Sequence, residues 1–230
     1  MGTPRRAPAG EPQIRWTAGT ATTREGRDVT TASPIEFWFD FSSGYAYLAA
    51  QEIDALGSRV NRAILWRPYM LGTAFRVTGM RGLSSTPVKG DYARHDWARA
   101  ARRMGIPFAP PEGHPKIALP ATRAFYWIEA NHPGHEKGFA REVFRQYYSG
   151  KLDTSDPDAV AGLAASLGLE AARVRAGLEA AEIKDQARAM SETAVQRGIF
   201  GSPFFVVDGE PFWGWDRLPM LEQWLRTGGW

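Results

Sequence analysis

The chain has 230 residues, which is enough for one sizeable domain or for a small domain that carries a large insertion. Its net charge of +3 is small and its basic and acidic residues alternate, so we expect no nucleic-acid partner. No apolar run approaches the ~20 residues that span a bilayer, so we expect no membrane partner either. The absence of cysteine fits a reducing compartment, and we expect a cytoplasmic protein.

The first 33 residues differ in composition from the rest of the chain. They are rich in glycine, proline, threonine and arginine, and they contain few large aliphatic side chains. Such a segment cannot bury enough apolar surface to offset the entropy lost on ordering. We therefore predict a disordered N-terminal extension over residues 1–33, and it lacks the apolar run of a secretory signal.

The next segment predicts a strand, a serine turn and a helix. Apolar side chains alternate over residues 35–41 with the period of a strand. Ser43 stands at the expected N-cap of a helix that Gly57 closes. A second strand is predicted over residues 63–66, and Pro68 ends it.

Residues 71–197 have an almost entirely helical pattern, followed by two short strands and a last helix. The predicted helices cover residues 92–104, 120–131, 136–149, 157–168 and 170–197, the last range as one helix or two. The strands are predicted over residues 204–208 and 211–213 with a turn at Asp208–Gly209, and the final helix over 217–226.

This order of elements predicts an α/β chain with a thioredoxin-like fold and a large all-helical insertion. Residues 34–70 and 198–230 would form the thioredoxin-like domain, and residues 71–197 the helical insertion. In that fold Ser42 and Ser43 occupy the turn where a CxxC pair would lie, so the site cannot exchange disulfides. It could instead hold the thiol of a small molecule, which points to glutathione.

Two residues are the first candidates for such a site. The Ser43 hydroxyl, at a helix N-terminus, is placed to stabilise a thiolate, although an ordinary N-cap explains the same pattern. A cis bond at Pro203 would leave the N–H and C=O of Ser202 free for an extended, peptide-like ligand. The alternative is a trans proline that merely starts the strand.

Charged residues supply the remaining candidates. The Asp216 carboxylate could hold an ammonium group, or it could cap the last helix. Lys89 could clamp a ligand carboxylate, or it could be an ordinary exposed lysine. The histidines show no metal-binding spacing, so we expect no metal site.

Four stretches carry a resemblance to known families: residues 39–49, 66–79, 86–99 and 198–218. In this order they resemble the 2-hydroxychromene-2-carboxylate isomerases and their relatives, the kappa-class glutathione transferases. Both belong to the DsbA-like thioredoxin group, and the resemblance covers residues 34–225. It implies glutathione as cofactor, a small aromatic substrate and a homodimer.

The resemblance also implies roles for individual residues. Ser43 corresponds to the catalytic serine, which hydrogen-bonds the glutathione sulfur. The residues implied to bind glutathione are Ser202, Pro203, Trp215, Asp216 and Lys89.

The implied activity is glutathione-dependent isomerisation of an aromatic breakdown intermediate, by reversible addition of a thiolate to a conjugated carbon. One alternative is a kappa-like transferase that keeps the thioether product. A further alternative is a non-catalytic binding protein with the same fold. It is supported by Gly44, where the families usually carry proline, and by Met80, where an asparagine is usual.

Overall fold

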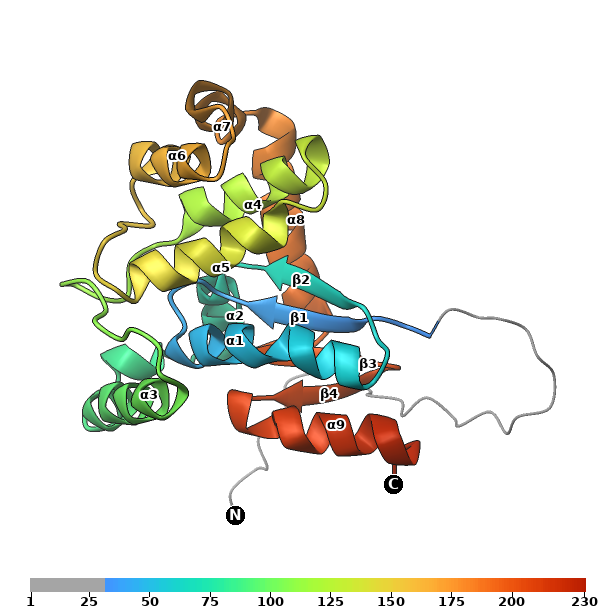
Figure 1. Cartoon of the computed structure of the whole chain (residues 1–230). Helices are drawn as coiled ribbons and strands as arrows, with labels where there is room; N and C mark the ends of the chain where they lie inside the picture. Colours follow the sequence, from blue (N-terminus) through green and yellow to red (C-terminus); the bar gives the residue numbers. More distant parts are fainter. Residues whose placement is uncertain (1–31) are drawn as a thin grey trace, which may run out of the picture.

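A four-stranded mixed sheet organises the chain, which a computed structural model describes for residues 32–230 (Figure 1). Of the predicted extension, residues 1–33, all but Ala32 and Ser33 lie outside the described residues. The strands are β1 (Ile35–Phe39), β2 (Ile64–Pro68), β3 (Phe204–Val207) and β4 (Glu210–Trp213), in the order β2-β1-β3-β4. β1 runs parallel to β2, and both β1 and β4 run antiparallel to β3. The two ends of the described chain therefore meet in one sheet.

Helices follow the predicted order around this sheet. α1 (Gly44–Arg59) joins β1 to β2, and α9 (Leu218–Thr227) follows β4. Between β2 and β3 lie α2 (Leu71–Thr78), α3 (Lys89–Met104), α4 (Leu119–Asn131), α5 (Glu136–Tyr147), α6 (Pro157–Ser166), α7 (Ala171–Gly177) and α8 (Ala181–Gln196). Short 3-10 turns cover Leu83–Ser85 (η1) and Trp215–Arg217 (η2). None of the described helices is long and apolar enough to cross a membrane.

Both faces of the sheet are buried, so the alternation in β1 separates two cores rather than core from solvent. Phe37 and Phe39 pack into the larger core, which α1, α4, α5 and α9 also line (Figure 1). Trp38 points to the opposite face and is only 1% exposed, because Tyr69 and α8 cover it. Burial of these large aromatic side chains supplies much of the apolar surface that stabilises the sheet.

The structure shifts several predicted boundaries. The second strand is predicted over residues 63–66, whereas β2 runs from Ile64 to Pro68 and so includes the proline. β1 ends at Phe39 rather than at residue 41, since the chain turns there and the Ser43 amide donates to the Asp40 carbonyl over 3.0 Å. Gly57 does not close α1, which continues to Arg59. A Cβ on Gly57 would lie 2.7 Å from the carbonyl oxygen of Arg62, so this glycine lets the start of β2 approach the helix.

The predicted turn between the last two strands is confirmed. Val207 pairs with Glu210, which leaves Asp208 and Gly209 as a two-residue loop, with φ of 51° and 83°. Positive φ at both central positions suits the right-handed twist of a hairpin and favours the Asp-Gly pair. This hairpin returns the chain, through β4, to the end of the sheet at which β1 finishes and α1 begins.

Candidate functional site

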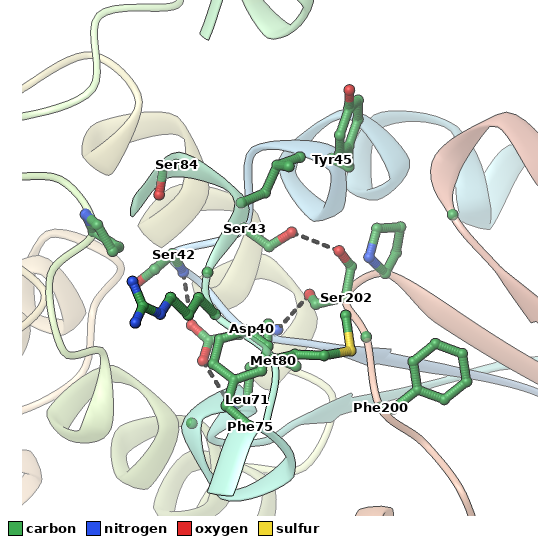
Figure 2. A pocket seen from close by; sticks show the side chains of 18 of the residues that line it. Asp40, Ser42, Ser43, Tyr45, Leu71, Phe75, Met80, Ser84, Phe200 and Ser202 are labelled. Carbon is green, nitrogen blue, oxygen red and sulfur yellow. Dashed lines mark hydrogen bonds between the residues drawn. The ribbon is translucent and has the colours of Figure 1, made fainter. Parts of the chain in front are cut away.

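A cavity of about 700 Å³ opens at the end of β1, where α1 begins. Its lining comes from the β1–α1 turn, from α2 and the loop after it, and from the loop before α4. The segment just before β3 and the segment at the end of β4 also line it. Figure 2 shows Ser43 and Ser202 facing each other here, on segments 159 residues apart in the chain. The fold thus brings the two predicted serine positions to one site.

The Ser43 hydroxyl makes two hydrogen bonds. It accepts one from the amide of Ala46 over 3.3 Å, which makes Ser43 the N-cap of α1. It donates the other to the carbonyl oxygen of Ser202 over 2.7 Å. The capping role and the placement in the cavity therefore occur together, and the sequence had left them as alternatives.

The peptide bond between Ser202 and Pro203 is cis. Both residues line the cavity. A peptide-like ligand would require a free Ser202 carbonyl. This carbonyl is not free, because it accepts a hydrogen bond from the Ser43 hydroxyl. In the described part of the chain, no hydrogen bond is made by the Ser202 amide. One of the two main-chain groups expected to meet a peptide-like ligand is thus available.

Asp40 is a site residue that the sequence reasoning missed. Its carboxylate accepts the amide of Ser42 over 2.9 Å and the amide of Leu71 over 3.0 Å, and its own amide donates to the Ser202 hydroxyl over 2.8 Å. Only 8% of the residue is exposed, and burial raises the pKa of the carboxyl group against the effect of those amides. An acidic residue at the end of an apolar strand was the available signal.

Asp216 and Trp215 both line the cavity, next to the end of β4. Asp216 does not cap α9, which begins without a side-chain capping bond; its carboxylate lies 3.3 Å from the guanidinium of Arg217 and is largely exposed. The indole of Trp215 donates to Glu52 over 2.7 Å and packs against the core. Trp215 is therefore part of the cavity wall, and Asp216 is open to a ligand.

Lys89 is not among the residues that line the cavity. It is exposed at the first turn of α3. The basic residues that do line the cavity are Arg81, Lys116 and Arg217. The sequence thus predicted a cation near the site but did not identify which side chains reach it.

One side of the cavity is apolar. Figure 2 shows Leu71, Phe75, Met80 and Phe200 gathered near Ser202. Trp213 extends this wall; its ring lies 4.8 Å from that of Phe200, and the residue is 49% exposed. Exposed aromatic surface in a concave site suits a flat apolar ligand.

A hydrogen-bonded chain supports the loop before α4. Ser42 donates to the carbonyl of Lys116, the Lys116 amide donates to the Tyr147 hydroxyl over 3.0 Å, and that hydroxyl lies 2.8 Å from Nδ1 of His114. Burial lowers the pKa of His114 to about 4, so the imidazole is neutral near pH 7. No metal-binding cluster of acidic and histidine residues occurs among residues 32–230.

Comparison with known proteins agrees with this architecture. Residues 34–226 match the DSBA-like thioredoxin domain family. Over 198 residues the chain is 28% identical to the 2-hydroxychromene-2-carboxylate isomerase of Sphingobium xenophagum, covering 83% of this chain and 97% of that protein. It is 24% identical over 208 residues to glutathione S-transferase kappa 1 of Homo sapiens, covering 83% and 92%.

A solved structure of a 2-hydroxychromene-2-carboxylate isomerase superposes with a TM-score of 0.75 at 24% identity, covering 84% of this chain and 94% of that one. The predicted fold class and the predicted family resemblance are both confirmed.

Proposed function

The chain belongs to the DSBA-like thioredoxin domain family, and we propose that it is a glutathione-dependent isomerase of a 2-hydroxychromene-2-carboxylate or benzylidenepyruvate type of aromatic intermediate. One observation carries the proposal. The Ser43 hydroxyl, at the N-terminus of α1, faces Ser202 beside a cis proline inside a cavity of about 700 Å³. That volume is within the range of small-molecule sites.

The residues present suit glutathione, which carries a thiol, a peptide backbone, an ammonium group and two carboxylates. The unpartnered amide of Ser202 would pair with the peptide backbone, and the exposed carboxylate of Asp216 would hold the ammonium group. When bound, glutathione would supply a thiolate that adds to a conjugated carbon and leaves after rotation about the former double bond.

The protein's contribution is to ionise that thiol. The hydroxyl of Ser43 and the first amides of α1 would stabilise negative charge at the sulfur. Lowering the thiol pKa by ~1–2 units corresponds to about 1.4–2.8 kcal/mol and leaves a substantial thiolate fraction near neutral pH. No cysteine is required of the protein, which has none.

A second candidate is a kappa-like glutathione transferase, supported by the similarity to glutathione S-transferase kappa 1. The two activities differ in their product. An isomerase releases unchanged glutathione, whereas a transferase releases a thioether conjugate of the electrophile. Mass spectrometry of the products distinguishes them.

The first test is calorimetry of glutathione binding, combined with the ultraviolet absorbance of the bound thiolate. We compare wild type with Ser43→Ala and with Ser58→Ala, a control in the same helix whose hydroxyl donates to the Asp54 carbonyl. We expect wild type and Ser58→Ala to bind glutathione and to show thiolate, and Ser43→Ala to show none. A folded wild type that does not bind glutathione rules out both enzymes and leaves the non-catalytic binding protein.

A further inference from the structure

Arg81 lines the cavity, and no ionic partner for it occurs in the part of the chain that the structure describes. Of the three basic residues in the wall, Lys116 lies 3.3 Å from Asp153, and Arg217 lies 3.3 Å from Asp216. No hydrogen bond or ion pair is made by the Arg81 side chain within residues 32–230. Arg81 is an exposed residue, so its guanidinium is accessible to a ligand that enters the cavity.

Each acidic residue of the wall has a partner other than Arg81. The Asp40 carboxylate accepts two main-chain amides, and that of Asp96 binds the Tyr45 hydroxyl and Arg99. The third, Asp216, is paired with Arg217. Within residues 32–230, none of the acidic side chains of the wall is therefore bonded to Arg81.

The surroundings of Arg81 indicate what kind of ligand this is. Arg81 follows Met80 in the loop between α2 and η1, and Met80 belongs to the apolar wall with Phe75 and Phe200 (Figure 2). A flat apolar body against this wall, with a carboxylate at one end, matches both the apolar surface and the free guanidinium. Arginine binds carboxylates in a two-pronged geometry that also fixes their orientation.

We propose that Arg81 determines substrate specificity by binding the carboxylate of an aromatic acid held in the cavity. The choice of an aromatic acid rests on the proposed function. That Arg81 lies beside an apolar wall, with no partner among the described residues, is an observation of this chain. Arg81 takes the role that the sequence gave to Lys89, because Arg81 lines the cavity and Lys89 does not.

The test uses trans-cinnamate and its uncharged amide as probes, with binding measured by calorimetry on the full-length protein. The variants are Arg81→Met, Arg81→Lys and a control, Arg76→Met. Arg76 is an exposed residue of α2 whose side chain bonds to Thr73 and does not line the cavity. Glutathione affinity is measured for each variant in the same way.

We expect Arg81→Met to weaken cinnamate binding about tenfold, the loss of one charge-assisted contact. Binding of the amide and of glutathione should not change, Arg81→Lys should restore part of the loss, and Arg76→Met should resemble wild type. The proposal is overturned if wild type does not bind cinnamate, if acid and amide lose affinity equally, or if only glutathione binding weakens. Because cinnamate binding needs no glutathione chemistry, the proposal is tested even if the isomerase assignment fails.

Discussion

The indole ring of Trp97 lies directly over Gly44, so that a Cβ on Gly44 would be 2.4 Å from Cδ2 of the ring. Trp97 comes from α3 and is 3% exposed, and its ring covers the first turn of α1 beside Ser43. The families that the sequence resembles usually carry proline at this position. Glycine there is the residue that allows α3 to approach the start of α1 so closely.

We predict that Gly44→Ala destabilises the protein by about 1–3 kcal/mol, because the added methyl group overlaps the Trp97 ring. Urea unfolding of Gly44→Ala, Trp97→Leu and the double variant measures the effect. The double variant should cost at least ~0.5 kcal/mol less than the sum of the two single changes, since the smaller leucine leaves room for the methyl group. Additive costs would show that the two sites do not interact.

Ser43 and Ser202 should differ in what their loss affects. Ser202→Ala removes the acceptor of the Asp40 amide, and we expect a cost of about 1–3 kcal/mol in the free energy of unfolding. It keeps the main-chain groups of residue 202, so the thiolate absorbance of bound glutathione should stay. Ser43→Ala removes a helix cap worth about 0.5–2 kcal/mol and should also abolish the thiolate signal. Loss of that signal in Ser202→Ala would contradict the assignment.

Asp40→Asn should be more disruptive than its similar shape suggests. Both carboxylate oxygens accept main-chain amides, from Ser42 and Leu71, and an asparagine amide can accept only one of them. We expect a loss of about 1–3 kcal/mol at neutral pH, measured by urea unfolding. The control is Asp91→Asn, which removes a surface pair with Arg94 and should cost less than ~1 kcal/mol. Equal effects of the two substitutions would show that the Asp40 contacts do not stabilise the turn.

His114 should make the protein less stable in mild acid. Its pKa is lowered from 6.5 to about 4 in the folded protein, so between these values the unfolded chain binds a proton that the folded protein does not. Stability is therefore lost as pH falls through this window, by about 1–3 kcal/mol. Unfolding free energies at several pH values should fall more steeply for wild type than for His114→Gln. Identical slopes would mean that the pKa of His114 is not lowered by folding. The raised pKa of Asp40 acts in the opposite direction, stabilising the folded protein as pH falls, but it is present in both proteins and cancels in the comparison.

The sequence predicted the parts of the fold and site that depend on local pattern. The alternation from Ile35, the capping position of Ser43 and the Asp208–Gly209 turn each constrain a few adjacent residues. A cis bond before Pro203 could be proposed from the sequence, because cis peptide bonds occur almost only before proline. The homodimer, the cytoplasmic location and the domain boundaries stay predictions.

Contacts between distant segments could not be predicted from one sequence. Asp40 meets the amide of Leu71 and the hydroxyl of Ser202, 31 and 162 residues away, and nothing near Asp40 in the chain signals either partner. The choice between Arg81 and Lys89 depends on how the loop after α2 and the start of α3 lie over the cavity. Both residues are basic and close in sequence, so composition and spacing do not separate them.

The Ser43 hydroxyl has one proton, and it donates that proton in a hydrogen bond to the Ser202 carbonyl. In the proposed function, a thiolate that accepts this hydrogen bond would displace the Ser202 carbonyl. Binding would then exchange one hydrogen bond for another, and its net free energy would be small compared with that of the bonds exchanged. Removing the Ser43 side chain would end this competition as well as the proposed interaction with sulfur. Affinity alone would then understate the role of Ser43, whereas the ionisation state of the bound thiol reports it directly.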